Sequence, residues 1–365
     1  MEATRISLVQ PQGATRLVVA SEPEGWLAEE LAPWVAGRRV FVVTSEHPWQ
    51  LHGAALDGAL GSAAAHRVLP VPDGEEAKSL AQAERLWRAL CAEGGKRDSR
   101  VVAFGGGSVG DLAGFVAGCF LRGIAVCQVP TTVISQVDAA VGGKTAVNLP
   151  EAKNAVGVFH HPELVLADPR WLATLGIREL RSGLAEVVKM AVLFDLALLE
   201  RVEETLGALE RGEPGAWGPV VASSQAIKAG VVGRDPADSG ERELLNFGHT
   251  LGHALEAGLG FGRLLHGEAV LYGMLFALRL AETRGEGAEV APRLRRLLAA
   301  LQPPALPALD PDIVWSRLER DKKGREGMQR WVLVDRPGQG RVAALRAAEV
   351  RPGLEEFLAR PWGSC

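Results

Sequence analysis

The stretch RVVAFGGGSVGDLAGFVAGCF, residues 100–120, decides the fold class of this chain. A short β-branched run leads into a glycine-rich turn and then into small and apolar residues that are typical of a helix. Gly105, Gly107 and Gly110 fit G-x-G-x-x-G, a pattern in which a helix N-terminus presents backbone N–H groups to a pyrophosphate. The acidic residue that usually follows about 20 residues later is missing, because that region reads IAVCQVPTT. This stretch alone leaves two interpretations open, a dinucleotide site and an ordinary tight turn.

Short strands and helices alternate on both sides of this turn. The segment EEAKSLAQAERLWRALCAE, residues 75–93, is typical of a helix. Strands are predicted over residues 39–45, 66–71, 100–106, 125–132 and 164–169. Such alternation favours a largely parallel sheet with helices on its faces.

After residue 169 the apolar residues recur with a helical period. Helices are predicted over residues 178–209, 216–232, 241–258, 267–282 and 288–301, and QRWVLVDRPGQGRVAAL near the end predicts one small hairpin. The sequence therefore indicates an α/β domain over residues 1–165 and a mainly α-helical domain over residues 166–365.

Composition excludes several classes of protein. The formal net charge is −4, with 47% hydrophobic and 23% charged residues, which is ordinary for a soluble globular protein. The chain has no excess of basic residues that would suggest nucleic acid or a membrane surface as a partner. The four cysteines form no CxxC pair and the first residues lack a signal-peptide pattern, so we expect the cytoplasm.

Three of the eight histidines, His249, His253 and His266, fall within 18 residues. Glu186 lies in the apolar context SGLAEVVKMAV, where a buried carboxylate needs a cation or a donor. Two histidine nitrogens, one carboxylate oxygen and an open position suit a catalytic zinc-like ion. Spacing does not decide which two histidines bind; His249 and His253, one helical turn apart, are the simplest pair. The alternative is a polar helix face with unrelated histidines.

Two other segments are ambiguous by themselves. In PDGEEAK, residues 72–78, Asp73 and Glu76 fit a helix capping box as well as a ligand site. Thr131 and Thr132 follow a strand and either bind a ligand or end the strand.

Six motifs together resemble one family. FGGGSVGDLAGFVA, VPTTVISQVDAAVGGKTAVN, KNAVGVFHHP, RSGLAEVVK, LLNFGHTLGHALE and HGEAVLYGM follow the order and spacing of 3-dehydroquinate synthases over about residues 70–275. The resemblance implies a Rossmann-like NAD-binding α/β domain followed by a helical metal- and substrate-binding domain. It also implies a cytoplasmic homodimer that acts on a small phosphorylated sugar acid.

The resemblance assigns the site residues in four sets. One divalent metal, Zn²⁺ or Co²⁺, is implied on Glu186, His249 and His266, which overrules the simplest pair. NAD is implied on Asp73, Glu75, Lys78, Gly106, Gly107, Ser108, Val109, Gly110, Asp111, Thr131, Thr132, Asp138, Lys144, Lys153, Trp171, Thr174 and Leu175. Substrate is implied on Arg122, Lys144, Asn154, Lys189, Lys228, Arg242, Asn246, His253 and Lys322, or Lys323 in place of Lys322. The catalytic set is Lys144, Asp138, Asn154, His253 and Lys189.

Lysine is scarce in this chain, with eight among 40 basic residues, and seven of the eight are among the residues that the resemblance assigns or in the late DKK. Phosphate and carboxylate oxygens are suitable partners for such cations.

The implied reaction converts 3-deoxy-D-arabino-heptulosonate 7-phosphate to 3-dehydroquinate and phosphate, a step of the shikimate pathway to aromatic amino acids. NAD would oxidise the C5 hydroxyl, phosphate would leave by β-elimination, and the hydride would return before ring opening and aldol closure. The alternatives are another sugar phosphate cyclase, a metal-dependent glycerol or polyol dehydrogenase, and a silent paralogue that only binds NAD or sugar phosphate. Ser45, Arg178, Pro236 and Asp238 depart from the family pattern.

Overall fold

The computed structural model describes residues 3–10, 13–22, 24–238, 240–260, 262–320 and 328–362. The chain forms two compact units: unit 1 comprises residues 1–176 and 211–236, and unit 2 comprises residues 177–210 and 237–365. The expected division into 1–165 and 166–365 differs from this at the boundary and at the return of residues 211–236 to unit 1. Helical periodicity shows that a helix has an apolar face but not which neighbour covers that face.

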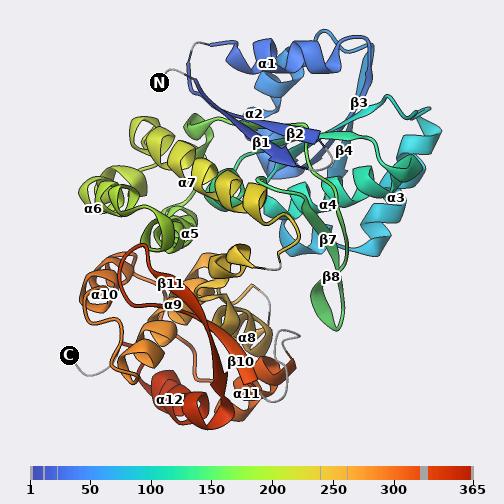
Figure 1. Ribbon diagram of the computed structural model, residues 1–365. Coiled ribbons are helices and arrows are strands. Elements are labelled where there is room, and N and C mark those ends of the chain that lie inside the picture. The colour runs from blue at the N-terminus through green and yellow to red at the C-terminus, as the bar shows by residue number, and fades with distance from the viewer. Residues whose placement is uncertain are drawn as a thin grey trace. The chain divides into compact units, whose positions relative to one another are not determined.

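Unit 1 is built on a seven-stranded sheet in the order β1-β2-β9-β6-β5-β3-β4 (Figure 1). β1 is antiparallel to β2, and the other neighbours are parallel. The strands are β1 (Thr4–Gln10), β2 (Gly13–Val19), β3 (Arg39–Ser45), β4 (Ala65–Val71), β5 (Arg100–Gly105), β6 (Ala125–Pro130) and β9 (Leu164–Ala167). The parallel α/β fold expected from the sequence is confirmed, whereas the β1–β2 hairpin was not predicted.

Alternating side chains of the strands build a core on each face of the sheet. Val40 and Val42 pack with α1 (Trp26–Val35) and α2 (Glu46–Ala59) on one face. On the opposite face, Phe41 and Val43 pack with α3 (Leu80–Ala92) and α4 (Gly107–Cys119). Near the β1 edge, α7 (Pro214–Arg234) buries Ala229 and Val232 against Leu8 and Leu17, which places this helix in unit 1.

Unit 1 also contains short helical elements and a second hairpin. They are η1 (Gly74–Ala77), η2 (Phe120–Arg122), η3 (Ser135–Ala139), η4 (Pro169–Thr174) and the hairpin β7 (Lys144–Leu149) and β8 (Ala152–Phe159). The sequence did not predict this hairpin, because glycines and polar residues interrupt the alternating pattern on which a strand prediction depends.

Unit 2 is mainly helical. Its elements are α5 (Ile177–Phe194), α6 (Leu196–Glu210), η5 (Glu241–Asn246), α8 (His249–Leu259), α9 (His266–Glu282), α10 (Ala291–Ala300), α11 (Pro311–Arg320), β10 (Met328–Val334), β11 (Gly340–Arg346) and α12 (Ala347–Ala359). The hairpin expected near the end is β10–β11.

Two helices expected to be continuous are interrupted. The prediction over residues 178–209 is α5 and α6, and the side chain of Asp195 between them accepts a hydrogen bond from the backbone N–H of Leu198 at 3.1 Å. The prediction over residues 241–258 is η5 and α8, with Gly248 between them at φ 82°. That left-handed conformation is readily available only to glycine, and it makes His249 the first residue of α8.

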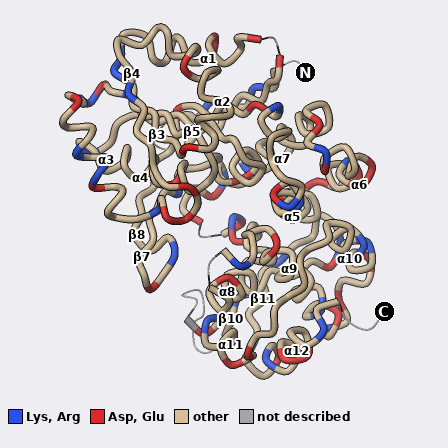
Figure 2. The backbone as a smooth tube through the Cα atoms, turned by 180° about the vertical axis from the view of Figure 1, so that it is seen from behind, with Lys and Arg blue, Asp and Glu red and all other residues tan. Residues whose placement is uncertain are grey.

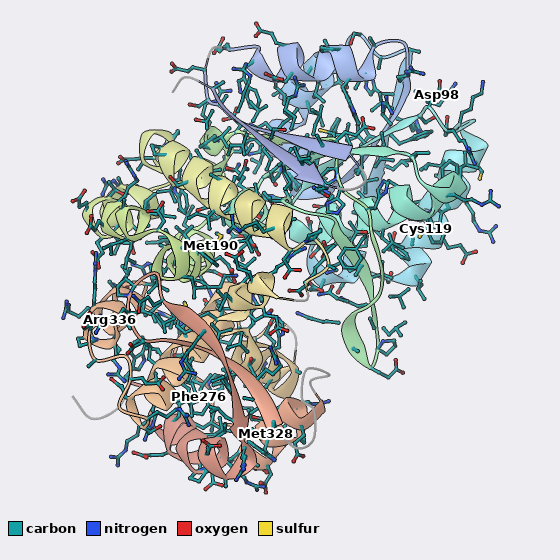
Figure 3. All side chains as sticks on the ribbon, in the orientation of Figure 1. Asp98, Cys119, Met190, Phe276, Met328 and Arg336 are labelled. Atoms are coloured by element: carbon teal, nitrogen blue, oxygen red, sulfur yellow. The ribbon has the colours of Figure 1, made fainter. Side chains whose placement is uncertain are left out.

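Aromatic rings form part of the core of unit 2. Phe276 of α9 lies 5.3 Å from Trp331 of β10 and 5.1 Å from Phe357 of α12, measured between ring centroids. Figure 3 labels Phe276 where side chains of these elements meet.

The charged residues of both signs are spread over the chain, as the small formal net charge of −4 suggests. Figure 2 shows Lys and Arg interspersed with Asp and Glu along both units. Within the described ranges, every helix is too short or too polar to span a lipid bilayer.

Candidate active site

The glycine-rich turn joins β5 to α4 in unit 1. Gly106 is the N-cap, so the backbone N–H groups of Gly107, Ser108 and Val109 start the helix and have no carbonyl partner within it. Val109 is buried, and Gly110 lies so close to Gln128 that a Cβ there would be 2.7 Å from Oε1 of that side chain. Strand, turn and helix thus have the arrangement that a pyrophosphate requires.

A polar network surrounds the start of α4. Lys78 is buried, and its Nζ lies 2.6 Å from Oδ2 of Asp111 and 2.5 Å from Oδ1 of Asn154. Ser108 Oγ donates to Oε1 of Glu75 at 3.3 Å. Burial raises the pKa of Asp111, and the charge of Lys78 opposes that shift. Asp73 is exposed and its side chain caps no helix, so the capping-box interpretation was wrong.

Thr131 and Thr132 lie beside the glycine turn, immediately after β6. The Thr131 N–H donates to the carbonyl of Gly105 at 3.0 Å. A Cβ added at Gly106 would lie 3.2 Å from Cγ2 of Thr132. The two threonines therefore end the strand and also line the turn.

Asp138 and Lys228 form an ion pair within unit 1. Lys228 Nζ of α7 lies 2.6 Å from Oδ1 of Asp138 and donates to its backbone carbonyl at 2.6 Å. Ala139, the next residue, approaches Gly107, where a Cβ would lie 3.3 Å from its own. The pair is therefore near the start of α4.

The remaining candidates of unit 1 fall into two groups. Trp171 is buried, stacks on His52 with centroids 5.6 Å apart, and precedes Thr174, whose Oγ1 lies 3.1 Å from His52 Nε2. Burial lowers the pKa of His52. Leu175 and Lys153 are half-buried, whereas Lys144, at the start of β7, and Arg122, at φ 66°, are exposed.

Glu186, His249 and His266 come together in unit 2. Glu186 lies in the middle of α5 and is fully buried, and the two histidines are the first residues of α8 and α9. Their Nε2 atoms lie 3.5 Å and 3.4 Å from Oε1 of Glu186. One ligand atom from each residue lies within 4.8 Å of the other two. The set implied by the family resemblance is thus assembled.

Glycines allow these helices to approach so closely. A Cβ at Gly267 would lie 1.8 Å from the carbonyl oxygen of Ser182 in α5. A Cβ at Gly273 would lie 1.8 Å from the carbonyl oxygen of Gly248, just before α8. Each distance excludes any larger residue, so both glycines hold α9 and its first residue, His266, against the other two helices.

Opposite charges gather around Glu186. Burial alone would raise the pKa of its carboxyl, but Lys189, with Nζ 2.5 Å from Oε2, and the two histidines hold that pKa well below its usual value. Burial and the charge of Lys189 lower the pKa of His249 well below its usual value. Burial also lowers the pKa of His266, but the carboxylates of Glu186 and Glu256 raise it overall to about 10.

These residues fit a divalent metal. Both carboxylate oxygens of Glu186 are buried, and neither accepts a hydrogen bond at a good angle. Lys189 offsets part of the cost of burying this carboxylate at Oε2, and a divalent cation held by Oε1 and the two histidines would offset the rest. Two imidazole nitrogens and one carboxylate oxygen suit Zn²⁺ and Co²⁺.

The other described candidates of unit 2 are His253, Arg242 and Asn246. His253 is exposed, and its ring centroid lies 5.3 Å from that of His249 and 5.9 Å from that of His266. Arg242 is buried in η5, and Asn246, at the end of η5, donates from Nδ2 to the Glu243 carbonyl at 3.0 Å. Lys322 and Lys323 lie outside the described residues.

The residues that depart from the family pattern are also placed. Arg178 pairs with Glu268 at 2.6 Å. Ser45 is buried at the end of β3, and Asp238 has a left-handed backbone at φ 57°.

Family models for the N-terminal and C-terminal parts of 3-dehydroquinate synthase match residues 68–182 and 183–324. The chain belongs to the 3-dehydroquinate synthase family. A 3-dehydroquinate synthase from Symbiobacterium thermophilum is 48% identical over 324 residues, which cover 87% of this chain and 90% of that protein.

Solved structures agree with the family assignment. A 2-deoxy-scyllo-inosose synthase, solved with carbaglucose-6-phosphate, NAD⁺ and Co²⁺, has 26% identity and a TM-score of 0.87 over 97% of this chain and 100% of its own. The 2-epi-5-epi-valiolone synthase of Streptomyces hygroscopicus, solved with NAD⁺ and Zn²⁺, has 29% identity and a TM-score of 0.86 over 98% and 100%. A glycerol dehydrogenase from Schizosaccharomyces pombe, at 16% identity and a TM-score of 0.67 over 94% and 93%, shares the fold.

Two polar residues at the site were missed by the sequence analysis. Asn148 of β7 donates from Nδ2 to Oε2 of Glu75 at 2.7 Å, and its Oδ1 accepts from the backbone N–H of Asn154 at 2.9 Å. Glu256 of α8 lies 3.2 Å from Nδ1 of His266. Both residues are inside quoted motifs, in TAVN and in HALE, but only their tertiary contacts distinguish them from ordinary strand and helix positions.

Proposed function

We propose that this protein is a 3-dehydroquinate synthase, which converts 3-deoxy-D-arabino-heptulosonate 7-phosphate to 3-dehydroquinate and phosphate. The observation that carries the proposal is the buried Glu186 carboxylate, which accepts no well-angled hydrogen bond and faces the Nε2 atoms of His249 and His266. The 48% identical 3-dehydroquinate synthase supports the choice of reaction.

In this proposal unit 2 is the metal domain. Glu186, His249 and His266 would hold one Zn²⁺ or Co²⁺, the ions found in the cyclase structures. Such an ion supplies Lewis-acid polarisation of hydroxyl and carbonyl oxygens. Lys189, buried beside Glu186, adds a fixed positive charge where alkoxide charge develops.

Unit 1 is the NAD domain in this proposal. NAD supplies a reversible hydride acceptor, so that it is regenerated in each turnover. The N–H groups at the start of α4 bind its pyrophosphate, and Glu75, Lys78 and Asp111 form the polar wall beside them. Thr131, Thr132, Trp171 and Thr174 complete the set that we assign to this cofactor.

Cations and orienting groups act on the substrate. Arg122, Lys144, Lys228 and Arg242 are assigned to neutralising its phosphate and carboxylate groups. Asp138, held by Lys228 at 2.6 Å, is assigned with Asn154 and His253 to orienting hydroxyl groups and transferring protons through water. Asn246 and Lys322 are proposed as further substrate contacts.

We also propose that the protein is a homodimer of the cytoplasm. The three cysteines that the structure describes, Cys91, Cys119 and Cys127, are free thiols, which suits a reducing compartment. The dimer follows from the family resemblance, and light scattering of the purified protein at several concentrations tests it.

Release of inorganic phosphate from the heptulosonate phosphate tests the function. Purified protein receives a small amount of NAD and either Zn²⁺ or Co²⁺, and NADH absorbance is followed in parallel. We expect phosphate in molar excess over the supplied NAD, no accumulation of NADH, and loss of activity with a chelator. The absence of phosphate release would overturn the proposal.

A second candidate is another sugar phosphate cyclase, because the inosose and valiolone synthases superpose over nearly the whole chain. The same assay with glucose 6-phosphate, the sugar that the ligand of the inosose synthase imitates, distinguishes this candidate. Accumulation of NADH on glycerol would instead indicate the dehydrogenase activity that the sequence left open.

A further inference from the structure

His266 is held at both of its ring nitrogens. Nε2 lies 3.4 Å from Oε1 of Glu186, inside the proposed metal site, and Nδ1 lies 3.2 Å from Oε2 of Glu256 on the opposite side of the ring. Glu256 lies on α8, seven residues after His249, and is only 6% exposed. A carboxylate buried to that extent needs a donor, and the imidazole supplies one.

His249 is held in the same way by a different acceptor. Its Nε2 faces Glu186 at 3.5 Å, and its Nδ1 lies 3.2 Å from the backbone carbonyl of Phe247. In both histidines, therefore, Nδ1 has an oxygen acceptor and Nε2 points to the buried carboxylate. An imidazole that carries its proton on Nδ1 leaves the lone pair of Nε2 available to a metal.

We propose that Glu256 is a positioning residue: it accepts the Nδ1 proton of His266 and so fixes the ring and its tautomer with Nε2 available to the metal. The inference rests on the proposed metal site. Carboxylate partners of this kind raise the basicity of a ligating histidine, and their loss typically weakens metal binding about 10- to 100-fold. The Nδ1 acceptor of His266 is a side chain, Glu256, whereas that of His249 is the backbone carbonyl of Phe247. A substitution can therefore remove the acceptor of His266 but not that of His249.

The main alternative is that Glu256 is itself a metal ligand. His253, Glu256 and His266 also place one ligand atom each within 4.8 Å of one another. With Nδ1 of His266, which lies 3.2 Å from Glu256, as its ligand atom, that arrangement would remove the hydrogen bond between them, and it relies on the exposed His253. The two interpretations differ in the number of metal ions per chain, one for the positioning role and two for the ligand role.

The experiment compares Glu256→Leu and Glu256→Gln with the unaltered protein. Zn²⁺ affinity is measured by competition with a chromophoric chelator, Co²⁺ stoichiometry by titration, and the coordination of Co²⁺ by its visible absorption. We expect one ion per chain, an affinity loss of about 10- to 100-fold for Leu, and a smaller loss for Gln, whose amide oxygen still accepts a hydrogen bond but a weaker one. The visible spectrum of bound Co²⁺ should likewise shift more in Glu256→Leu than in Glu256→Gln.

Glu268→Gln is the matched control. Glu268 is a buried carboxylate two residues after His266, and it bonds to Arg178 and to the backbone N–H of Leu265. Its replacement disturbs the start of α9 without removing the acceptor of the imidazole, so Zn²⁺ affinity should stay within about threefold of the unaltered protein.

Four results would overturn the inference. They are an unchanged affinity in both Glu256 variants, equal losses in Glu256→Gln and Glu268→Gln, two ions per chain with one lost on replacing Glu256, and no metal binding by the unaltered protein. The last result also removes the proposed function, whereas the first three leave it intact. If Glu256→Leu does not fold, the Zn²⁺ affinity and the Co²⁺ spectrum of Glu256→Gln still test the inference.

Discussion

The histidine that reaches Glu186 from α9 is the residue on which the metal assignment depends most directly. His266→Ala removes the Nε2 atom that lies 3.4 Å from Oε1 of Glu186. Because the His266 side chain is 32% exposed, the fold should survive while bound metal and phosphate release are lost. Metal analysis, circular dichroism and the phosphate assay measure these three properties. A variant that keeps its full rate would refute the assignment.

His253→Ala is the counterpart to that substitution. Helical spacing makes His249 and His253 the simplest pair, but His253 is exposed and, among the described residues, belongs to no group that contains Glu186. We therefore expect the variant to retain one metal ion per chain and to lose turnover. Loss of the metal from this variant, with retention in His266→Ala, would restore the pair suggested by spacing.

The pKa of His266 predicts how pH affects the metal-free protein. The folded-state pKa is about 10, above the ordinary 6.5 of an unfolded chain, because the carboxylates of Glu186 and Glu256 outweigh burial. The stability that this ion pairing contributes is complete below pH 6.5 and is lost as pH rises toward 10. Urea unfolding of metal-free protein across this window measures the loss. His266→Ala should show a flatter profile, and equally steep profiles would contradict the prediction.

Lys144 tests the role of the scarce lysines. It is exposed at the start of β7, and we assign it mainly to the phosphate of the substrate. Lys144→Ala should raise the KM for substrate by about 10- to 100-fold, the equivalent of about 1.5–3 kcal/mol for a charged hydrogen bond, with a smaller effect on NAD affinity. Steady-state kinetics and NAD titration separate the two effects. Equal losses would indicate a structural lysine.

At the level of elements, glycine decides how closely the helices of unit 2 pack. Gly267→Ala would place a Cβ 1.8 Å from the Ser182 carbonyl oxygen, and such overpacking costs about 1–3 kcal/mol or more. We expect a lower free energy of unfolding together with weaker metal binding, because α9 carries His266. Chemical denaturation and metal titration measure both quantities.

Gly258→Ala is the control for that prediction. Gly258 is also helical, in α8, but its added Cβ would meet no atom closer than 3.7 Å. Alanine should therefore stabilise the protein by about 0.5–1 kcal/mol, with metal binding retained. Similar destabilisation by both substitutions would show that close approach is not the cause.

Sequence reasoning was most accurate for elements whose residues carry a regular pattern. The strands β3, β4, β5, β6 and β9 were predicted to within a few residues, because they are short apolar runs followed by turn residues, whereas β1 and β2 were not predicted. The break before α8 was missed, although NFGHTLGH contains the signal, Gly248. A glycine inside an apolar period is compatible with a continuous helix as well as with a cap, and the close approach of α9 makes it a break here.

For the whole molecule, the two units should respond to different ligands. Hydrogen exchange with added NAD should slow the backbone amides at the start of α4 in unit 1, and added Zn²⁺ should slow those at the starts of α8 and α9 in unit 2. A ligand that binds the folded state adds about 2.7 kcal/mol of stability at 100 times its Kd. Protection by NAD confined to unit 2 would contradict the assignment of the units.

Spacing and periodicity along the chain indicated the strands β3, β4, β5, β6 and β9 of unit 1, the glycine turn before a helix, and three histidines with one apolar-flanked glutamate. These features are local, so the spacing and periodicity of residues along the chain are enough to predict them. Tertiary contacts place α7 in unit 1, which no pattern in the sequence indicated. They also bring His266, 17 residues after His249, to Glu186, as the family resemblance implied and helical spacing did not. The physical reason is that Gly267 and Gly273 allow contacts between backbones far apart in sequence, and no period along one helix encodes such contacts.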